Sequence, residues 1–219
     1  MATNRTDAPA AERGRSLMDW FQVNSRLLGI AAAVVAVALV GMWFYNQYRQ
    51  NRTVNAERSL TLAQQSLASG NTSLAMSDLQ KVATRYEGTA AGTEAAMLLA
   101  RQNFDQGKYQ EGIDALKKAA DKAGPSRANV EGLIGDGYAQ LGKGVDAAKA
   151  YERAAEATGP YESERAYYRA KAARSYAAAG NVAEAKRVWG ELATQEKSAS
   201  IAAEAKVRLA ELTARRAGT

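Results

Sequence analysis

The stretch of this sequence closest to a chemical motif is Gly137-Tyr-Ala-Gln-Leu-Gly142-Lys143-Gly144. It has the two glycines and the lysine of a phosphate-binding loop, but Gly144 stands where that motif needs a serine or threonine to hold magnesium. A phosphate-binding loop also follows a strand, whereas this stretch is predicted to lie at a helix end. We therefore predict no nucleotide site here.

Other residue types that support catalysis are missing or isolated. The chain has no His and no Cys, which excludes imidazole as a general base and thiolate as a metal ligand. Asp136 lies between two glycines, and Glu162 and Glu164 open a helix, where carboxylates favour the helix dipole. No two carboxylates stand out as an acid–base couple. We predict no catalytic residue, no metal site and no cofactor, so the chain is not expected to be an enzyme.

The basic charge of the chain is spread along its length. The formal net charge is +6 and the isoelectric point is about 9.5, but basic and acidic residues alternate. A nucleic-acid groove needs clustered basic residues with aromatic residues between them. The pattern therefore indicates a solvated surface, and no nucleic-acid partner is predicted.

One segment near the N-terminus is apolar on every face. Leu27 to Tyr45 carries no charge and would be about 28 Å long as a helix, close to the ~30 Å of bilayer hydrocarbon. We predict a transmembrane helix over 27–48, preceded by a tail over 1–26 that begins disordered and ends in a short interfacial helix. The residues expected to anchor these segments at the membrane interface are Trp20, Phe21, Trp43, Phe44, Tyr45, Tyr48 and Arg49.

Two alternatives to a membrane span remain open. A cleaved signal peptide could end at Ala36-Val37-Ala38, but apolar and aromatic residues continue past that site. The second alternative is a buried helix of a soluble protein, which is disfavoured because every face of this segment is apolar. Basic residues flank the span equally, so we base the orientation on the architecture: a short tail before the span and a long domain after it predict a cytoplasmic N-terminus and a periplasmic C-terminal domain.

The rest of the chain, 49–219, contains an internal repeat. Four stretches align without gaps around the turn glycines Gly70, Gly107, Gly142 and Gly180. A small residue stands seven positions before each glycine and another five positions after it. Nine positions after the glycines come the larger residues Leu79, Leu116, Tyr151 and Trp189.

These spacings predict pairs of packed helices. Glycine ends the first helix of a pair, the small residues let two helices approach, and the large residue fills the remaining space. This is the tetratricopeptide pattern, whose unit is ~34 residues of helix–turn–helix. We predict an all-α fold: one N-terminal transmembrane helix, then an α-solenoid of about four helix pairs and a C-terminal capping helix. The predicted first helices are Val54–Ser69, Ala91–Gln106, Ser126–Leu141 and Tyr161–Ala179, and the capping helix is Ala199–Arg215.

Aromatic and basic residues on the first helices are the candidates for partner binding. Tyr138 and Tyr176 hold equivalent positions, and Tyr167 and Tyr168 lie on the same helix as Tyr176. First helices line the concave face, where we expect a partner to bind. Arg169, Lys171 and Arg174 would give that face a basic lining. The alternative is that these tyrosines only pack between repeats.

The whole chain from about residue 15 resembles the bacterial ancillary Sec-translocon subunits, which are membrane-anchored tetratricopeptide proteins. The resemblance covers GMWFYNQYRQ at the end of the span, NAERSLTLAQQSLASG after it and the segment AAMLLARQNFDQGKYQEGIDAL. It implies a translocon-associated periplasmic chaperone or adaptor of the bacterial inner membrane, with the lipid bilayer, the Sec translocon and periplasmic folding factors as partners. The alternatives are a structural or assembly subunit of a large respiratory or photosynthetic inner-membrane complex, and a cell-envelope scaffold.

Overall fold

The computed structural model describes residues 25–195 and 198–217, and in these residues all regular secondary structure is helical. The predicted all-α class is confirmed. The interfacial helix predicted around Trp20 and Phe21 lies outside the described residues. In chain order the elements are α2 (Ser25–Ala68), α3 (Thr72–Arg85), α4 (Ala90–Asp105), α5 (Tyr109–Ala120), the short 3-10 helix η1 (Gly124–Ser126), α6 (Arg127–Gln140), α7 (Gly144–Ala157), α8 (Glu162–Ala178), α9 (Val182–Gln195) and α10 (Ala199–Ala217).

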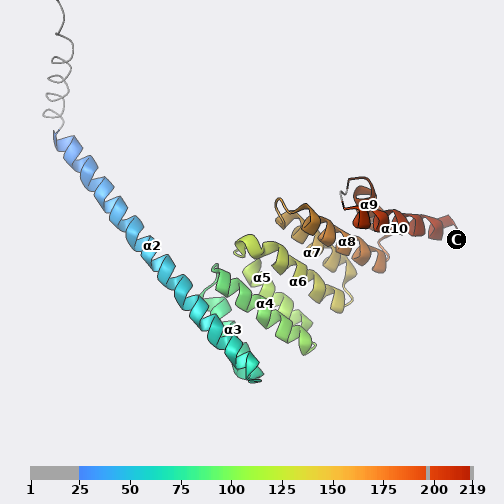
Figure 1. Cartoon of the computed structure of the whole chain (residues 1–219), viewed down its shortest axis with the longest axis horizontal. Coiled ribbons are helices and arrows are strands. Elements are labelled where there is room, and N and C mark those ends of the chain that lie inside the picture. The colour runs from blue at the N-terminus through green and yellow to red at the C-terminus, as the bar shows by residue number, and fades with distance from the viewer. Residues whose placement is uncertain (1–24, 196–197, 218–219) are drawn as a thin grey trace, which may run out of the picture. The chain divides into compact units, whose positions relative to one another are not determined.

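The chain divides by its internal contacts into two units, residues 1–51 and residues 52–219. In the second unit the helices pack in pairs that follow one another along the chain, from α3 to α10 (Figure 1). The end of α2, α4, α6 and α8 are the first helices of four pairs, and α3, α5, α7 and α9 are the second helices. The predicted solenoid of four helix pairs and a final helix is confirmed.

Each first helix ends at a glycine in the left-handed backbone region. The φ angles are +78° at Gly70, +74° at Gly107, +70° at Gly142 and +75° at Gly180. In each turn the amide after the glycine donates to a carbonyl five residues back, as Lys143 does to Tyr138 over 2.9 Å. This bond closes a Schellman motif, which requires a conformation that side chains with a Cβ resist. The regular position of these glycines sets the regular length of the helices.

The second helices fill the space between first helices with one large side chain each. The Tyr151 ring lies against Gly135 so closely that a Cβ on this glycine would be 2.5 Å from the ring. Leu79, Leu116 and Trp189, at the equivalent position in the other pairs, are almost completely buried. Small residues at the helix crossings therefore make room for the bulky ones, as the repeat spacing predicts.

The predicted span and the first helix of the first repeat form one continuous helix. α2 runs without interruption from Ser25 to Ala68, whereas the sequence suggested separate helices over 27–48 and Val54–Ser69. No Gly or Pro occurs between Gly41 and Gly70, so nothing in the backbone ends the helix between them. The division of the chain after Asn51 falls inside this helix.

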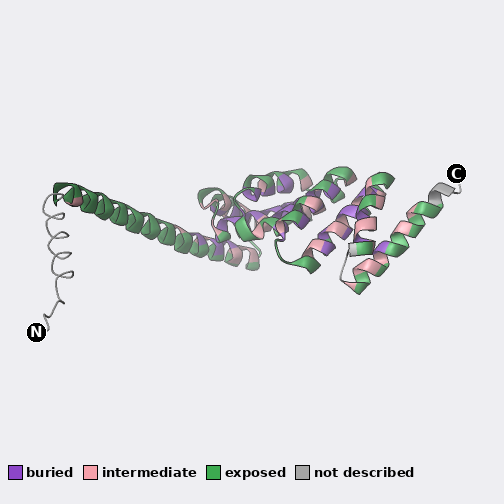
Figure 2. Cartoon of the chain, turned by 90° about the horizontal axis from the view of Figure 1, so that it is seen from above, coloured by how far each residue is buried: buried purple, intermediate pink, exposed green. Residues whose placement is uncertain are grey.

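The described part of the first unit, residues 25–51, has no buried side chain (Figure 2). Within the described ranges, α2 is the one helix whose length and composition are sufficient to cross a bilayer. In water such a surface would be strongly unfavourable, because each apolar side chain would remain hydrated.

The last helix closes the stack with one apolar stripe. Ala205 of α10 is buried, and Ile201, Leu209 and Leu212 pack half-buried against the core of the last two pairs. Val207, an apolar residue of the same helix, is 56% exposed. The stripe follows the spacing 201, 205, 209, 212 of one helix face, and residue 207 falls outside it.

Candidate protein-interaction surface

The predicted partner-binding residues of α8 lie on more than one side of that helix. Tyr167, Lys171 and Arg174 are spaced by four and three residues and share the side that faces neighbouring first helices. Arg169 and Tyr176 contact second helices: Arg169 pairs with Glu191 of α9 at 3.6 Å, and the Tyr176 hydroxyl donates to Glu152 of α7 at 2.8 Å. The structure therefore does not gather them into one groove.

Asp136 is the centre of a polar cluster on the first-helix side. Its Oδ1 accepts a hydrogen bond from the Tyr151 hydroxyl at 2.6 Å and pairs with Lys171 Nζ at 2.5 Å. The same ammonium lies 4.6 Å from the Tyr151 ring centre and 5.5 Å from that of Tyr167, a cation–π geometry. We call Asp136, Tyr151, Tyr167 and Lys171 the Asp136 cluster. It joins α6, α7 and α8.

Residues at the same repeat position as Asp136 also connect neighbouring first helices elsewhere in the stack. Six residues before Gly180 stands Arg174, which forms two hydrogen bonds with Glu204 of α10 at 2.9 and 2.6 Å. These bonds hold the pKa of the Glu204 carboxyl below its usual value. Six residues before Gly70 stands Gln64, which donates to Glu94 of α4 at 3.1 Å. Polar contacts at one repeat position thus fix neighbouring first helices side by side.

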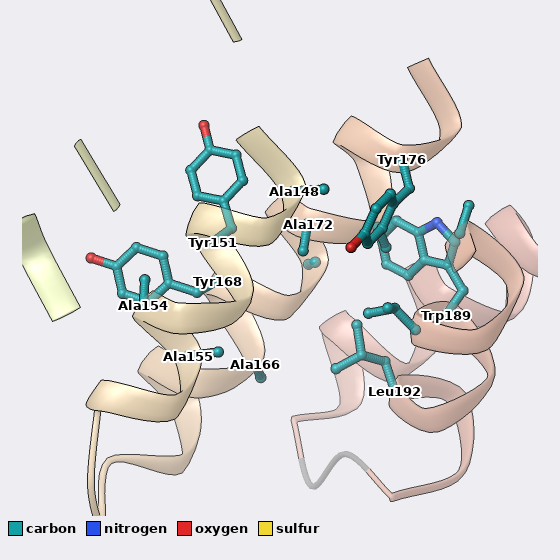
Figure 3. Close-up of a cluster of buried hydrophobic side chains, with 14 of the residues drawn as sticks. Ala148, Tyr151, Ala154, Ala155, Ala166, Tyr168, Ala172, Tyr176, Trp189 and Leu192 are labelled. Atoms are coloured by element: carbon teal, nitrogen blue, oxygen red, sulfur yellow. The ribbon is translucent and has the colours of Figure 1, made fainter. Parts of the chain in front are cut away.

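The remaining predicted tyrosines are mostly occupied by packing (Figure 3). Tyr168 is 7% exposed, covers Gly132 and donates to Asn129 at 3.2 Å. Tyr176 is 4% exposed, in the cluster that also contains Trp189. These two burials favour the packing alternative.

Two of the predicted tyrosines keep surface that a partner could reach. Tyr138 is half-buried beneath the ammonium groups of Lys117 and Lys143, at 5.2 and 5.9 Å. Tyr167 is 51% exposed, so about half of this residue is open to solvent. Tyr138 and Tyr167 are therefore the accessible tyrosines of the predicted site, and a role in binding stays a prediction.

Arg187 of α9 organises the opposite side of α8. Its guanidinium bonds to Glu152 at 2.6 Å, Glu184 at 2.7 Å and Glu191 at 3.1 Å. Hydrogen bonds to Glu184 and Glu152 raise the pKa of this guanidinium above its ordinary value. One guanidinium thus holds together three carboxylates of α7 and α9.

The predicted membrane-interface residues of α2 are all exposed. Trp43 and Phe44 meet edge to face with ring centres 5.0 Å apart, and the Arg49 guanidinium lies 5.8 Å from the Tyr45 ring centre. Tyr48 is exposed on the next turn. Trp20 and Phe21 lie outside the described residues. A cluster of aromatic and cationic side chains at the end of an apolar helix is typical of a headgroup interface.

Two glycines of the phosphate-loop-like stretch, Gly137 and Gly144, have packing roles. A Cβ on Gly137 would lie 2.6 Å from Ile113 and 2.8 Å from Phe104, and one on Gly144 would lie 2.9 Å from Ala179.

Among the described residues, no group of three or more carboxylates is arranged to hold a metal ion. The accessible chemistry of this surface is hydrogen bonding, ion pairing and ring contact, which suits binding to protein.

Burial of the tyrosines predicts a loss of stability in alkali. Burial raises the pKa of Tyr168 and of Tyr176 to about 12, above the ordinary value near 10 in the unfolded chain. Folding therefore favours the protonated phenols, and this contribution is complete below pH ~10 and lost as the pH rises toward ~12. We expect urea midpoints to fall over that range, and to fall less in Tyr168→Phe and Tyr176→Phe.

The exposed Tyr161 provides the control for this experiment. Tyr161→Phe should leave the alkaline slope as it is in the unmodified chain. If the phenolate absorbance of Tyr168 and Tyr176 rose near pH 10 with the solenoid still folded, the account of their burial would be wrong.

Sequence reasoning missed two members of the Asp136 cluster. The sequence pattern singled out Asp136 only as an isolated carboxylate, and it assigned Tyr151 only to packing. The available signal was repeat position, because Asp136, Gln64 and Arg174 all stand six residues before a turn glycine and all are polar.

Comparisons with known proteins agree with the repeat architecture. The family model described as a tetratricopeptide repeat-like domain matches residues 18–129 and, in a second register, residues 58–172. No curated protein matches the chain.

Solved structures of similar fold include nearly identical TPR-like repeats of a candidate kinesin light chain from Podosopora anserina. That structure has a TM-score of 0.54 and 17% sequence identity, and the match covers 75% of this chain and 88% of that one. A single-substitution variant of the same repeat protein has a TM-score of 0.54 and 18% identity, with 75% and 87% covered. At this identity the likeness concerns the fold. Because the family model matches more than half of its length, the chain belongs to the tetratricopeptide repeat-like domain family.

Proposed function

We propose that this protein is a non-catalytic, membrane-tethered scaffold for protein–protein interactions. The observation that carries the proposal is α2, one helix whose first half is apolar and exposed and whose last turns form the first repeat helix. An apolar surface of this length requires a nonpolar environment. Tetratricopeptide repeats present extended surfaces for protein partners, so anchor and binding surface are parts of one chain.

The more specific role that we propose is a translocon-associated periplasmic chaperone or adaptor. It is supported by the resemblance of the span exit and of the first two repeats to the ancillary Sec-translocon subunits. In this role α2 crosses the bacterial inner membrane with its N-terminus in the cytoplasm, and the repeat domain lies in the periplasm. The exposed ring of Tyr167 and the basic side chains around it would contact emerging or partly folded proteins.

Crosslinking inside the membrane tests this role. A photo-reactive amino acid replaces Trp43 in one variant and Tyr167 in another, because both side chains are exposed. We expect Sec subunits among the adducts from position 43, and exported chains or folding factors among those from position 167. A third variant with the probe at the exposed Tyr161 controls for random collision.

Two outcomes would contradict the translocon role. One is a set of adducts without any Sec component. The other is recovery of the chain in fixed stoichiometry with a respiratory or photosynthetic complex, which would favour the structural-subunit alternative.

A further inference from the structure

A hollow of about 410 Å³ lies between the second helices α3 and α5, with α4 beneath it. Ala96 and Leu99 of α4 are buried at its floor, and Ala115 of α5 is half-buried beside them. Polar side chains surround this apolar floor, among them Glu111 and Asp114 of α5. We call this hollow the α3–α5 groove.

Two positions beside the equivalent grooves of later repeats carry an ion pair. Across α6, Glu131 and Arg153 form an ion pair at 2.9 Å, and they stand eleven residues before and after Gly142. Across α8, Arg169 and Glu191 hold the same two positions relative to Gly180 and pair at 3.6 Å.

In the α3–α5 groove the same two positions are Ala96 and Lys118. A methyl group cannot reach across to an ammonium, so the ion pair of the other two pairs has no counterpart here. The equivalent groove over α8 is also hollow, at about 600 Å³, and it differs from the α3–α5 groove in the charges of its lining.

The charges around the α3–α5 groove are unbalanced, unlike those around the equivalent groove over α8. In the pocket over α8 three glutamates and three arginines balance, the latter including Arg187, seven residues after Gly180. In the α3–α5 groove that position is Asp114. The lining contains the three carboxylates of Glu87, Glu111 and Asp114 and the one ammonium of Lys118, so its formal charge is −2.

The carboxylates of α5 are not neutralised by a basic side chain across the groove. Among the described contacts, Asp114 accepts only from Gln110 of its own helix, at 2.9 Å. Glu87 pairs with Lys122 at 2.9 Å. An incoming cation would thus meet exposed carboxylates above an apolar floor.

We propose that the α3–α5 groove binds an arginine-bearing segment of a protein partner. The guanidinium would pair with Asp114 and Glu111, and its methylene stem would lie over Ala96 and Leu99, which combines charge-assisted hydrogen bonds with apolar contact. The proposal rests on the scaffold function above and names the chemistry of one partner segment.

The test uses the full chain in lipid nanodiscs and two labelled peptides. One peptide carries two arginines four residues apart in a Gly/Ser/Ala background, and its twin carries uncharged citrulline at both places. In fluorescence anisotropy we expect the arginine peptide to bind at least ten times more tightly. The Glu111→Gln/Asp114→Asn variant should lose about that factor, because it keeps the shape of the groove and removes its charge.

Two further variants control for fold and position. Ala96→Arg places an arginine at the floor of the groove, at the repeat position of Arg169, and it should abolish peptide binding while the helical circular dichroism of the repeat domain is kept. Asp146→Asn/Glu57→Gln removes the same number of charges elsewhere and should bind normally. Asp146 is a matched position, four residues after its turn glycine as Glu111 is.

Equal binding of the two peptides, full binding by Glu111→Gln/Asp114→Asn, or tighter binding of a glutamate-containing peptide would each overturn the proposal. None of these measurements reports on the translocon or on the contacts of the span. If the groove did not bind the arginine peptide, the crosslinking result at positions 43 and 167 would be unchanged. The two proposals can therefore be contradicted separately.

Discussion

Replacing Trp189 with alanine is expected to destabilise the repeat domain by about 3–5 kcal/mol, the usual cost of removing a buried indole. Trp189 is 1% exposed and is the largest of the fully buried side chains. It belongs to the core cluster formed by α6 to α10 (Figure 3). In a linear stack each repeat contacts only its neighbours, so the loss should be concentrated at the C-terminal end.

Hydrogen exchange combined with urea unfolding measures this effect. In Trp189→Ala we expect the amides of α9 and α10 to exchange much faster, while those of α4 keep their protection. Tyr161→Ala, which removes an exposed ring in the same domain, should change stability by no more than ~0.5 kcal/mol. Equal effects of the two substitutions would contradict the assignment of Trp189 to the core.

Two aspartates in the first half of α2 are expected to release the chain from the membrane. Val34 and Val37 lie near the middle of the apolar segment and are exposed. A charged residue at the centre of a membrane helix costs about 2.5–3.5 kcal/mol, so Val34→Asp/Val37→Asp should cost about 5–7 kcal/mol. Extraction with alkaline carbonate should then move most of this variant into the supernatant.

The matched control for the aspartates is Val34→Leu/Val37→Leu, which keeps the segment apolar. This variant should remain in the pellet as the unmodified chain does, and both variants should keep the helical circular dichroism of the repeat domain. Retention of the aspartate variant in washed membranes would mean that this segment of α2 does not lie in hydrocarbon.

The helices of the solenoid could be predicted within a few residues because glycine fixes their ends. For example, the first helix predicted over Ala91–Gln106 is α4, which spans Ala90–Asp105. The sequence did not predict that the span and the first repeat helix form one helix. Composition changes sharply near Arg49, and this change suggested a boundary, whereas a helical backbone continues through a stretch without Gly or Pro. Amino-acid composition indicates the environment of a helix, whereas Gly and Pro residues indicate where it ends.

The surface was predicted less well than the fold. Residue type placed Tyr167, Tyr168, Arg169, Arg174 and Tyr176 in one groove, although a helix turns by about 100° per residue and separates neighbours such as 168 and 169. The burial of Tyr168 depends on Gly132, 36 positions earlier in the sequence, and no local pattern reveals such a contact. Comparing repeat positions with one another would have identified Asp136 and the open α3–α5 groove.

Labelling of one introduced cysteine tests the central claim most directly. The chain has no native cysteine, so Ser69→Cys, in the exposed turn after α2, gives a single reactive site. We predict that a membrane-impermeant maleimide labels this variant in intact spheroplasts and that the labelled protein sediments with the membranes. Labelling that requires lysis, or labelled full-length protein in the soluble fraction, would contradict a scaffold tethered at the periplasmic face.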